Sequence, residues 1–147
     1  MIAPLPDLLI EPIVRAALAE DLGRAGDLTA QACIDADARL DATFGVRRQG
    51  VVAGLACARL AVLAMDPSAR FETLIADGAA VSPGAVLAKV SANARALLSA
   101  ERTALNLLGR SGLGAGDLDT QYRAGAEEGT VLEVSPNVGT VLSRNSA

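Results

Sequence analysis

The chain has 147 residues, enough for one domain with its own core and short of the roughly 200 or more residues of a (β/α)8 barrel enzyme. Its formal net charge is −4, and Lys89 is the one lysine among its 13 basic residues, so nucleic acid is not an expected partner. The chain contains no histidine, which excludes serine–histidine triads, histidine general bases and most zinc sites.

The cysteines and the apolar runs indicate a cytoplasmic protein that does not cross a membrane. Cys33 and Cys57 do not form a CxxC motif, and the N-terminus lacks the basic segment of a signal peptide. We therefore expect two reduced, structural thiols. The most apolar run, residues 51 to 65, contains Arg59 and is shorter than the about 20 residues of a membrane span.

The first predicted element is a helix over residues 7 to 22. Asp7 is a plausible N-cap and Gly23 a plausible stop, whereas Pro12 suggests that the regular helix begins only near Glu11. Apolar residues recur at helical spacing, namely Leu8, Leu9, Ile13, Val14, Ala17 and Leu18.

Strands and helices then alternate along the chain. Residues 39 to 48 predict a half-buried strand with one apolar face, formed by Leu40, Ala42, Phe44 and Val46. The next predicted elements are a short strand near residues 49 to 55 and a helix ending at Asp66. They are followed by a strand from Arg70, two short strands around Pro83 and Gly84, and a helix over 93 to 110. This order predicts an α+β domain with a mainly antiparallel sheet. After residue 110 we expect partial order, with a strand-like "TVLEV".

The helix predicted over residues 93 to 110 carries a glutamate in its apolar face. That face is formed by Ala94, Leu97, Ala104, Leu105 and Leu108, with Leu98 at its margin. A carboxylate among leucines costs several kcal/mol in order of magnitude unless it is paired. We therefore expect Glu101 to have a partner, either an arginine or backbone amides.

Polar residues gather on an adjoining side of the same helix: Arg95, Ser99, Arg102 and Asn106. Arg102 is either a solvated arginine or a clamp for an anion, since a guanidinium can grip a carboxylate through two parallel hydrogen bonds. We expect Asn106 to fasten a neighbouring loop. The acidic residues Glu20, Asp21 and Asp27 are expected to cap helix ends and fasten loops, and we assign no metal to them.

Five segments resemble, in order and spacing, the N-terminal portion of quinolinate phosphoribosyltransferase, the carboxylating nicotinate-nucleotide pyrophosphorylase. They are "ALAEDLGRAGDLTA", "RRQGVVAGL", "MDPSARFE", "DGAAVSPGAVLAKV" and "ARALLSAERTALNLLGR", and the resemblance covers about residues 7 to 112. It implies an open-faced sandwich with helices on one side of the sheet, normally followed by an α/β barrel. It also implies a transferase of NAD biosynthesis that joins quinolinate to phosphoribosyl pyrophosphate, with magnesium, and makes nicotinate mononucleotide, carbon dioxide and pyrophosphate.

The resemblance also implies roles for two residues of the "ERTALN" motif. In this family the active site forms in a homodimer, between the barrel of one subunit and the N-terminal domain of the other. The arginine of the motif, Arg102 here, then helps to bind the dicarboxylate substrate. We infer that Glu101 orients the helix or its arginine.

The chain departs from the family where the barrel would begin. We therefore divide it into a phosphoribosyltransferase N-terminal-like domain, residues 1–112, and a divergent tail, residues 113–147. The cationic residues, the histidine and the metal-binding carboxylates of the barrel have no counterparts in this chain. We assign it no catalytic residue and no cofactor, and we expect it to bind quinolinate only when a barrel is supplied and to be inactive alone.

Three alternatives stay open. In the first, the chain is a non-catalytic interaction module or a truncated gene product, and helix 93 to 110 exposes an apolar surface. In the second, it is related to a pyrophosphorylase-like protein associated with molybdenum transport, which shares similar motifs. In the third, it is a carrier domain, whose pattern the segment "DGAAVSPGAVLAKV" resembles. Carrier domains hold their modified lysine at a hairpin tip, whereas Lys89 is expected inside a strand.

Overall fold

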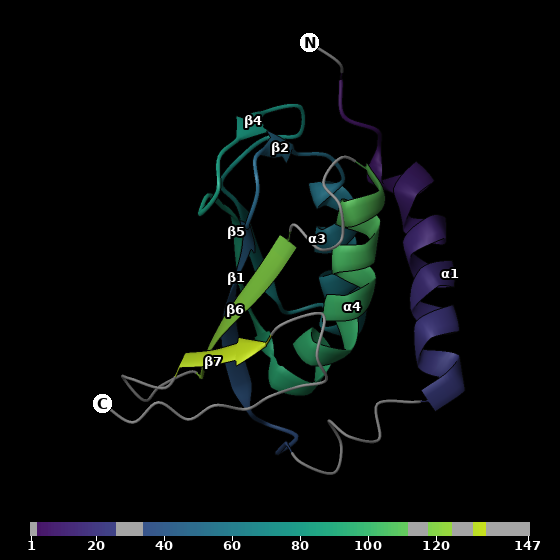
Figure 1. The fold of residues 1–147 in the computed structure, drawn as a ribbon. Helices are drawn as coiled ribbons and strands as arrows, with labels where there is room; N and C mark the ends of the chain where they lie inside the picture. The colour runs from purple at the N-terminus through teal and green to yellow at the C-terminus, as the bar shows by residue number, and fades with distance from the viewer. Residues whose placement is uncertain (1–2, 26–33, 112–117, 125–130, 135–147) are drawn as a thin grey trace.

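The computed structural model of the chain describes residues 3–25, 34–111, 118–124 and 131–134 (Figure 1). Its helices are α1 (Asp7–Ala25), α3 (Leu55–Met65) and α4 (Ala94–Ser111). Its strands are β1 (Arg39–Val46), β2 (Gly50–Val51), β3 (Arg70–Thr73), β4 (Ala80–Val81), β5 (Val86–Asn93), β6 (Leu118–Ala124) and β7 (Val131–Val134).

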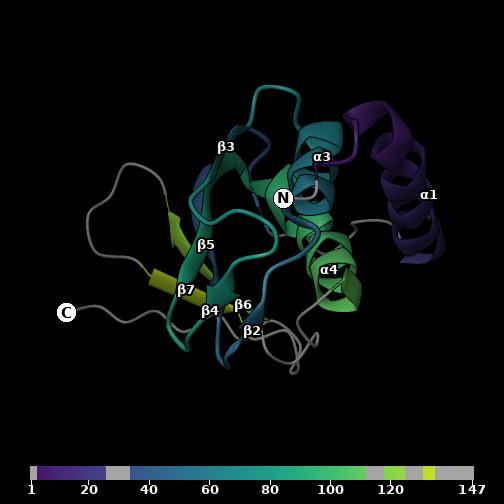
Figure 2. The same cartoon turned by 90° about the horizontal axis from the view of Figure 1, so that it is seen from above.

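The fold is an open-faced sandwich, as predicted. Five strands form an antiparallel sheet in the order β3-β5-β1-β6-β7, and β2 and β4 form a separate two-stranded sheet. The helices lie on one side of the large sheet, with α3 and α4 next to it and α1 outside them (Figures 1 and 2). Because α4 lies between the sheet and α1, most of its surface is covered.

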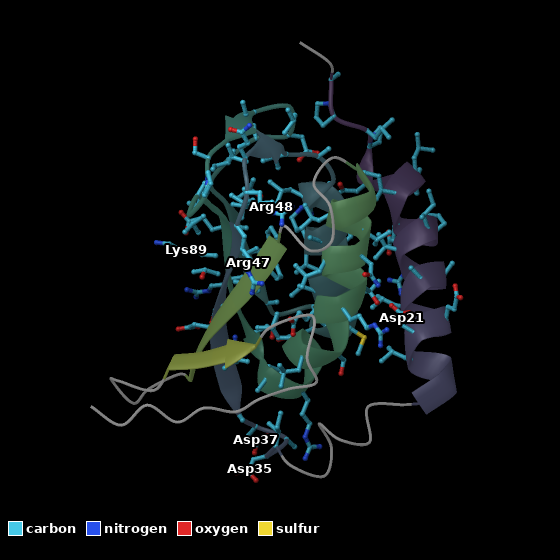
Figure 3. The ribbon with its side chains drawn as sticks, viewed as in Figure 1. Asp21, Asp35, Asp37, Arg47, Arg48 and Lys89 are labelled. Atoms are coloured by element: carbon cyan, nitrogen blue, oxygen red, sulfur yellow. The ribbon has the colours of Figure 1, made fainter. Side chains whose placement is uncertain are left out.

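The central strand β1 shows the alternation that its sequence predicts. Its four apolar residues Leu40, Ala42, Phe44 and Val46 are all buried. Asp41 is exposed, and Thr43 pairs with Lys89 of β5, which is also exposed. Figure 3 shows Lys89 on the side of the sheet away from the helices. Lys89 therefore lies inside a strand, as expected, which does not suit a carrier domain.

Helix α1 buries only part of the apolar set that its sequence places at helical spacing. The apolar residues Ile10, Val14 and Leu18 are buried against the rest of the domain, whereas Leu8 and Ile13 are 80% and 63% exposed. Both groups recur at helical spacing, so periodicity alone did not distinguish the core face from the outer face. Of the six apolar residues predicted at helical spacing, Val14 and Leu18 are buried, whereas Leu8, Leu9 and Ile13 are exposed.

Both ends of α1 also differ from the prediction. The helix begins at Asp7 and continues through Pro12 and Gly23 to Ala25. Proline removes the hydrogen bond that its nitrogen would donate to the carbonyl four residues earlier, which is that of Leu8. Since Leu8 is exposed, water can reach this region of the helix, and the loss is tolerated.

Two strands lie in the tail, beyond residue 112. Strand β7 coincides with the predicted strand-like segment, whereas β6 pairs with β1 along its whole length and was not predicted. The segment "LDTQYRA" does alternate between polar residues and Leu, Thr, Tyr and Ala, which is a period-two signal for a strand. The boundary at residue 112 stays a prediction.

The position of Leu97 in the core predicts a contrast between two leucine substitutions. Leu97 is fully buried on α4, whereas Leu8 is mostly exposed on α1. Leu97→Ala should lower the free energy of unfolding by about 2–5 kcal/mol, because it leaves a cavity. Leu8→Ala should change it by less than about 0.5 kcal/mol. Urea denaturation followed by circular dichroism measures both, and equal losses would contradict this assignment of the core.

Candidate functional site

The start of α4 is held by a carboxylate from the end of α3. Asp66 is 8% exposed, and its Oδ2 accepts a hydrogen bond of 2.8 Å from the backbone N–H of Asn93. Its Oδ1 accepts bonds from the backbone N–H and the hydroxyl of Ser68, at 2.9 and 2.7 Å. Asn93 in turn caps α4, since its Oδ1 accepts a bond of 3.2 Å from the N–H of Ala96.

These hydrogen bonds stabilise the charged form of the Asp66 carboxyl. The N–H of Asn93 and the hydroxyl of Ser68 lower its pKa below the ordinary value, against the effect of burial. Asp66 is therefore a carboxylate in the folded protein, and it fixes the junction between α3, β5 and α4.

The middle of α4 is held by α1. The Thr103 hydroxyl donates a hydrogen bond of 2.5 Å to Oδ2 of Asp21, and Thr103 is 1% exposed. Figure 3 shows Asp21 on the side of α1 that faces α4. Asp21 thus fastens one helix to another, in keeping with the fastening role expected of these acids. Asp27 lies outside the described residues.

Glu101 lies within the apolar face of α4, as its sequence position predicts. It is 7% exposed, and the leucines of this face, Leu97, Leu105 and Leu108, are buried around the same stretch of helix. Glu101 has an interaction partner, as expected of a carboxylate in such a position. A change of its charge would therefore disturb the packing of α4.

Arg102 lies on the surface, between the buried residues Glu101 and Thr103. Its side chain is exposed, and it has no hydrogen bond or ion pair with any residue in the described parts of the chain. Asn106, one turn later, is exposed too, and its amide bonds to no described residue, so the expected loop contact is not found there. Among the described residues, none therefore occupies the guanidinium of Arg102.

Helix α3 carries a free thiol, Cys57, and its first residues are capped by Asp77. The carboxylate of Asp77 accepts hydrogen bonds from the backbone N–H groups of Gly54 and Leu55, at 3.0 and 3.2 Å, and so caps the helix. Gly54 has a φ of 94°, a conformation that favours glycine. Burial and the charge of Asp77 raise the pKa of Cys57, which is a free thiol. This thiol is therefore a poor nucleophile.

Metal-ligand clusters and membrane-spanning helices are both absent from the described residues. No group of three or more His, Cys, Asp or Glu side chains among them could hold a metal ion. None of the helices in this part of the chain has the length and hydrophobicity needed to cross a bilayer.

The lowered pKa of Asp66 predicts a pH dependence of stability. Asp66→Asn should lower the free energy of unfolding by about 1–3 kcal/mol at pH 7, since an amide nitrogen cannot accept the bond from Asn93. Because the carboxyl pKa is lower in the folded state than in the unfolded state, the stabilisation is complete above the unfolded value of about 3.9. It decreases as the pH falls through the folded value, so the wild type and the variant should converge in acid.

Denaturation curves from pH 7 down to pH 2.5 measure this difference. Asp41→Asn provides a control, because Asp41 is exposed on the open face of β1. The control should change stability by no more than about 0.5 kcal/mol at pH 7. A constant difference between wild type and Asp66→Asn across this range would contradict the role of the ionised Asp66.

Comparisons with known proteins identify the family. Residues 27–111 match the family described as "Quinolinate phosphoribosyl transferase, N-terminal domain". The chain is 38% identical over 105 residues to the chloroplastic carboxylating nicotinate-nucleotide pyrophosphorylase of Arabidopsis thaliana, covering 71% of this chain and 30% of that protein. It is 38% identical over 109 residues to a probable carboxylating nicotinate-nucleotide pyrophosphorylase of Synechocystis, covering 74% of this chain and 36% of that protein.

Solved structures share the fold. The nicotinate-nucleotide pyrophosphorylase of Francisella tularensis superimposes with a TM-score of 0.65 at 30% identity, over 71% of this chain and 36% of that one. NadC of Streptococcus pyogenes superimposes with a TM-score of 0.69 at 27% identity, over 73% and 38%. The chain thus spans about a third of the length of these relatives. It belongs to the quinolinate phosphoribosyltransferase family, which it matches through the N-terminal domain.

Proposed function

We propose that the chain supplies the N-terminal, substrate-binding and dimerising domain of a quinolinate phosphoribosyltransferase. In this role it helps to hold quinolinate while a barrel domain catalyses its reaction with phosphoribosyl pyrophosphate. The products of that reaction are nicotinate mononucleotide, carbon dioxide and pyrophosphate. The cytoplasmic location stays a prediction, since the named relatives include chloroplastic and mitochondrial enzymes.

The exposure of Arg102 is the observation that supports this role. The residue on either side of it is buried, so the backbone of Arg102 is held while its side chain faces outward. Quinolinate has two carboxylates on a planar ring, and a guanidinium can bind a carboxylate through two parallel hydrogen bonds. Glu101 would orient Arg102 indirectly, through the seating of α4.

The remaining chemistry requires groups from outside this chain. With no histidine and one lysine, the chain could not neutralise the phosphates and carboxylates of both substrates in the way that the family does. The described residues provide no cluster of ligands for magnesium, so we assign the ion to the barrel. Alone, the chain offers one part of the site, and we expect it to bind quinolinate only when a barrel is supplied and to show no turnover by itself.

The Arg102 role predicts a loss of affinity in a complete enzyme. In a chimera, residues 7–111 of this chain would replace the matching segment of the Synechocystis relative. Arg102→Ala in this chimera should weaken quinolinate binding by roughly 1 to 3 kcal/mol, because a charge-assisted hydrogen bond is lost. Calorimetry measures the affinity, and a turnover assay measures product formation.

Arg70→Ala provides the matched control in the same chimera, because Arg70 is an exposed arginine on β3, away from α4. It should leave quinolinate affinity unchanged. Unchanged affinity in Arg102→Ala would remove the proposed contact. Full turnover by the purified 147-residue chain would contradict the need for a barrel.

Exposed apolar residues favour a second role, that of an interaction module. We had expected the apolar surface on helix 93 to 110, and this is wrong, because the large apolar residues described on α4 are buried or half-buried. Among the described residues, most of the exposed large apolar side chains instead lie near the start of the chain, namely Leu5, Leu8, Leu9 and Ile13, and the others are Val51, Leu74 and Val86. A surface of this kind favours association with a partner, including the homodimer proposed above.

This surface predicts concentration-dependent association of the isolated chain. Sedimentation velocity should detect dimers or larger species at high concentration, and the double variant Leu9→Glu and Ile13→Glu should reduce them. Circular dichroism of the variant should remain that of the wild type, since both residues are exposed. A strictly monomeric wild type at every concentration would count against the interaction module.

A further inference from the structure

The side chains of Arg102 and Asn106 form an outward-facing pair on α4. Among the described side chains of this helix, residues 94–108, these are the two that are exposed, and the others are buried or half-buried. Positions four residues apart lie on the same side of a helix, with about 5–6 Å between their Cβ atoms. A molecule bound at Arg102 would therefore lie beside Asn106.

We propose that Asn106 is a second substrate-contacting residue, which binds the second carboxylate of the dicarboxylate held by Arg102. This inference rests on the proposed function and extends it, because it makes Asn106 a residue that distinguishes dicarboxylates from monocarboxylates. The pair would act as a two-point recognition element on one helical turn.

The chemistry and direction of the side chain favour this role. The amide Nδ2 of Asn106 can donate a hydrogen bond to a carboxylate without adding a charge. Side chains in a helix lean toward its N-terminus, so the amide of Asn106 leans over the turn that carries Arg102. A ligand with carboxylates on two neighbouring ring atoms offers one acceptor group to the guanidinium and another to the amide.

The other polar residues on this side of α4, Arg95 and Ser99, form hydrogen bonds inside the domain. The Ser99 hydroxyl donates a bond of 2.7 Å to the carbonyl of Arg95, and Nε of Arg95 donates one of 2.7 Å to the carbonyl of Ile34. The side chains of Arg102 and Asn106 have no hydrogen bond or ion pair to residues in the described ranges. The polar side of α4 thus has two parts: Arg95 and Ser99 are bonded within the domain, and Arg102 and Asn106 face outward.

Side-chain NMR signals of the ¹⁵N-labelled chimera described above, which supplies a barrel, test this pairing directly. The Nε–H signal of Arg102 and the side-chain amide of Asn106 are assigned with the variants Arg102→Ala and Asn106→Ala. Quinolinate is then compared with nicotinate, which has one carboxylate. We expect quinolinate to shift both signals with the same apparent Kd, and nicotinate to shift that of Arg102 alone.

Variants provide the quantitative test. Asn106→Ala should raise the apparent Kd for quinolinate about two- to tenfold, the effect of one hydrogen bond, and leave that for nicotinate unchanged. Asn106→Asp should raise it further, because a carboxylate repels a dianion. Arg70→Ala should have no effect, and the backbone spectrum of each variant should remain that of the folded wild type.

The outcomes separate the two proposals. If quinolinate shifts Arg102 but not Asn106, or if Asn106→Ala leaves the Kd unchanged, the inference about Asn106 is overturned and the role of Arg102 stands. If the Arg102 signal does not move at saturating quinolinate, the role of Arg102 and the pairing with Asn106 are both overturned.

Discussion

The seating of α4 between the sheet and α1 is the constraint on which the candidate site depends. Polar contacts fix it at two levels: Asp66 and Asn93 hold its first turn, and Asp21 holds the Thr103 hydroxyl two turns later. A rotation or a slide of the helix would break these contacts and leave buried polar groups unsatisfied. Each unsatisfied group costs about 1–3 kcal/mol, so the helix has one strongly favoured register.

This single register explains why the exposed residues of α4 are suited to binding. Over residues 94–108, most side chains of the helix are buried or half-buried, and the two exposed ones carry a guanidinium and a primary amide. Because the backbone beneath them is held, binding an anion would order only the side chains, which reduces the entropy lost on binding.

Much of this arrangement was predictable from local patterns. The alternation in residues 39 to 48 predicted which face of β1 is buried, and the helical spacing in residues 93 to 110 predicted the buried face of α4, including Glu101. The exposed position of Arg102 follows from the same spacing. Its availability did not follow, because a pattern cannot show which polar groups find partners within the domain.

The errors arose where two patterns were equally strong or where a partner was distant. Helix α1 has two apolar stripes, and only its contacts with α3 and α4 determined that Ile10, Val14 and Leu18 are buried. Strand β6 lies in a glycine-rich tail, and its pairing with β1 joins residues about 80 positions apart. The bond between Asp21 and Thr103 likewise links residues 82 positions apart, which a local pattern does not reveal.

The sequence by itself determined the fold class, the family and the faces of β1 and α4, because these follow from hydrophobic periods and from motifs within short segments. The tertiary structure alone decided which face of α1 is buried, how α4 is fastened, and that Arg102 and Asn106 are the outward-facing pair of that helix among its described side chains. The physical reason is that exposure and hydrogen bonding depend on groups brought together by folding, and not on neighbours along the chain.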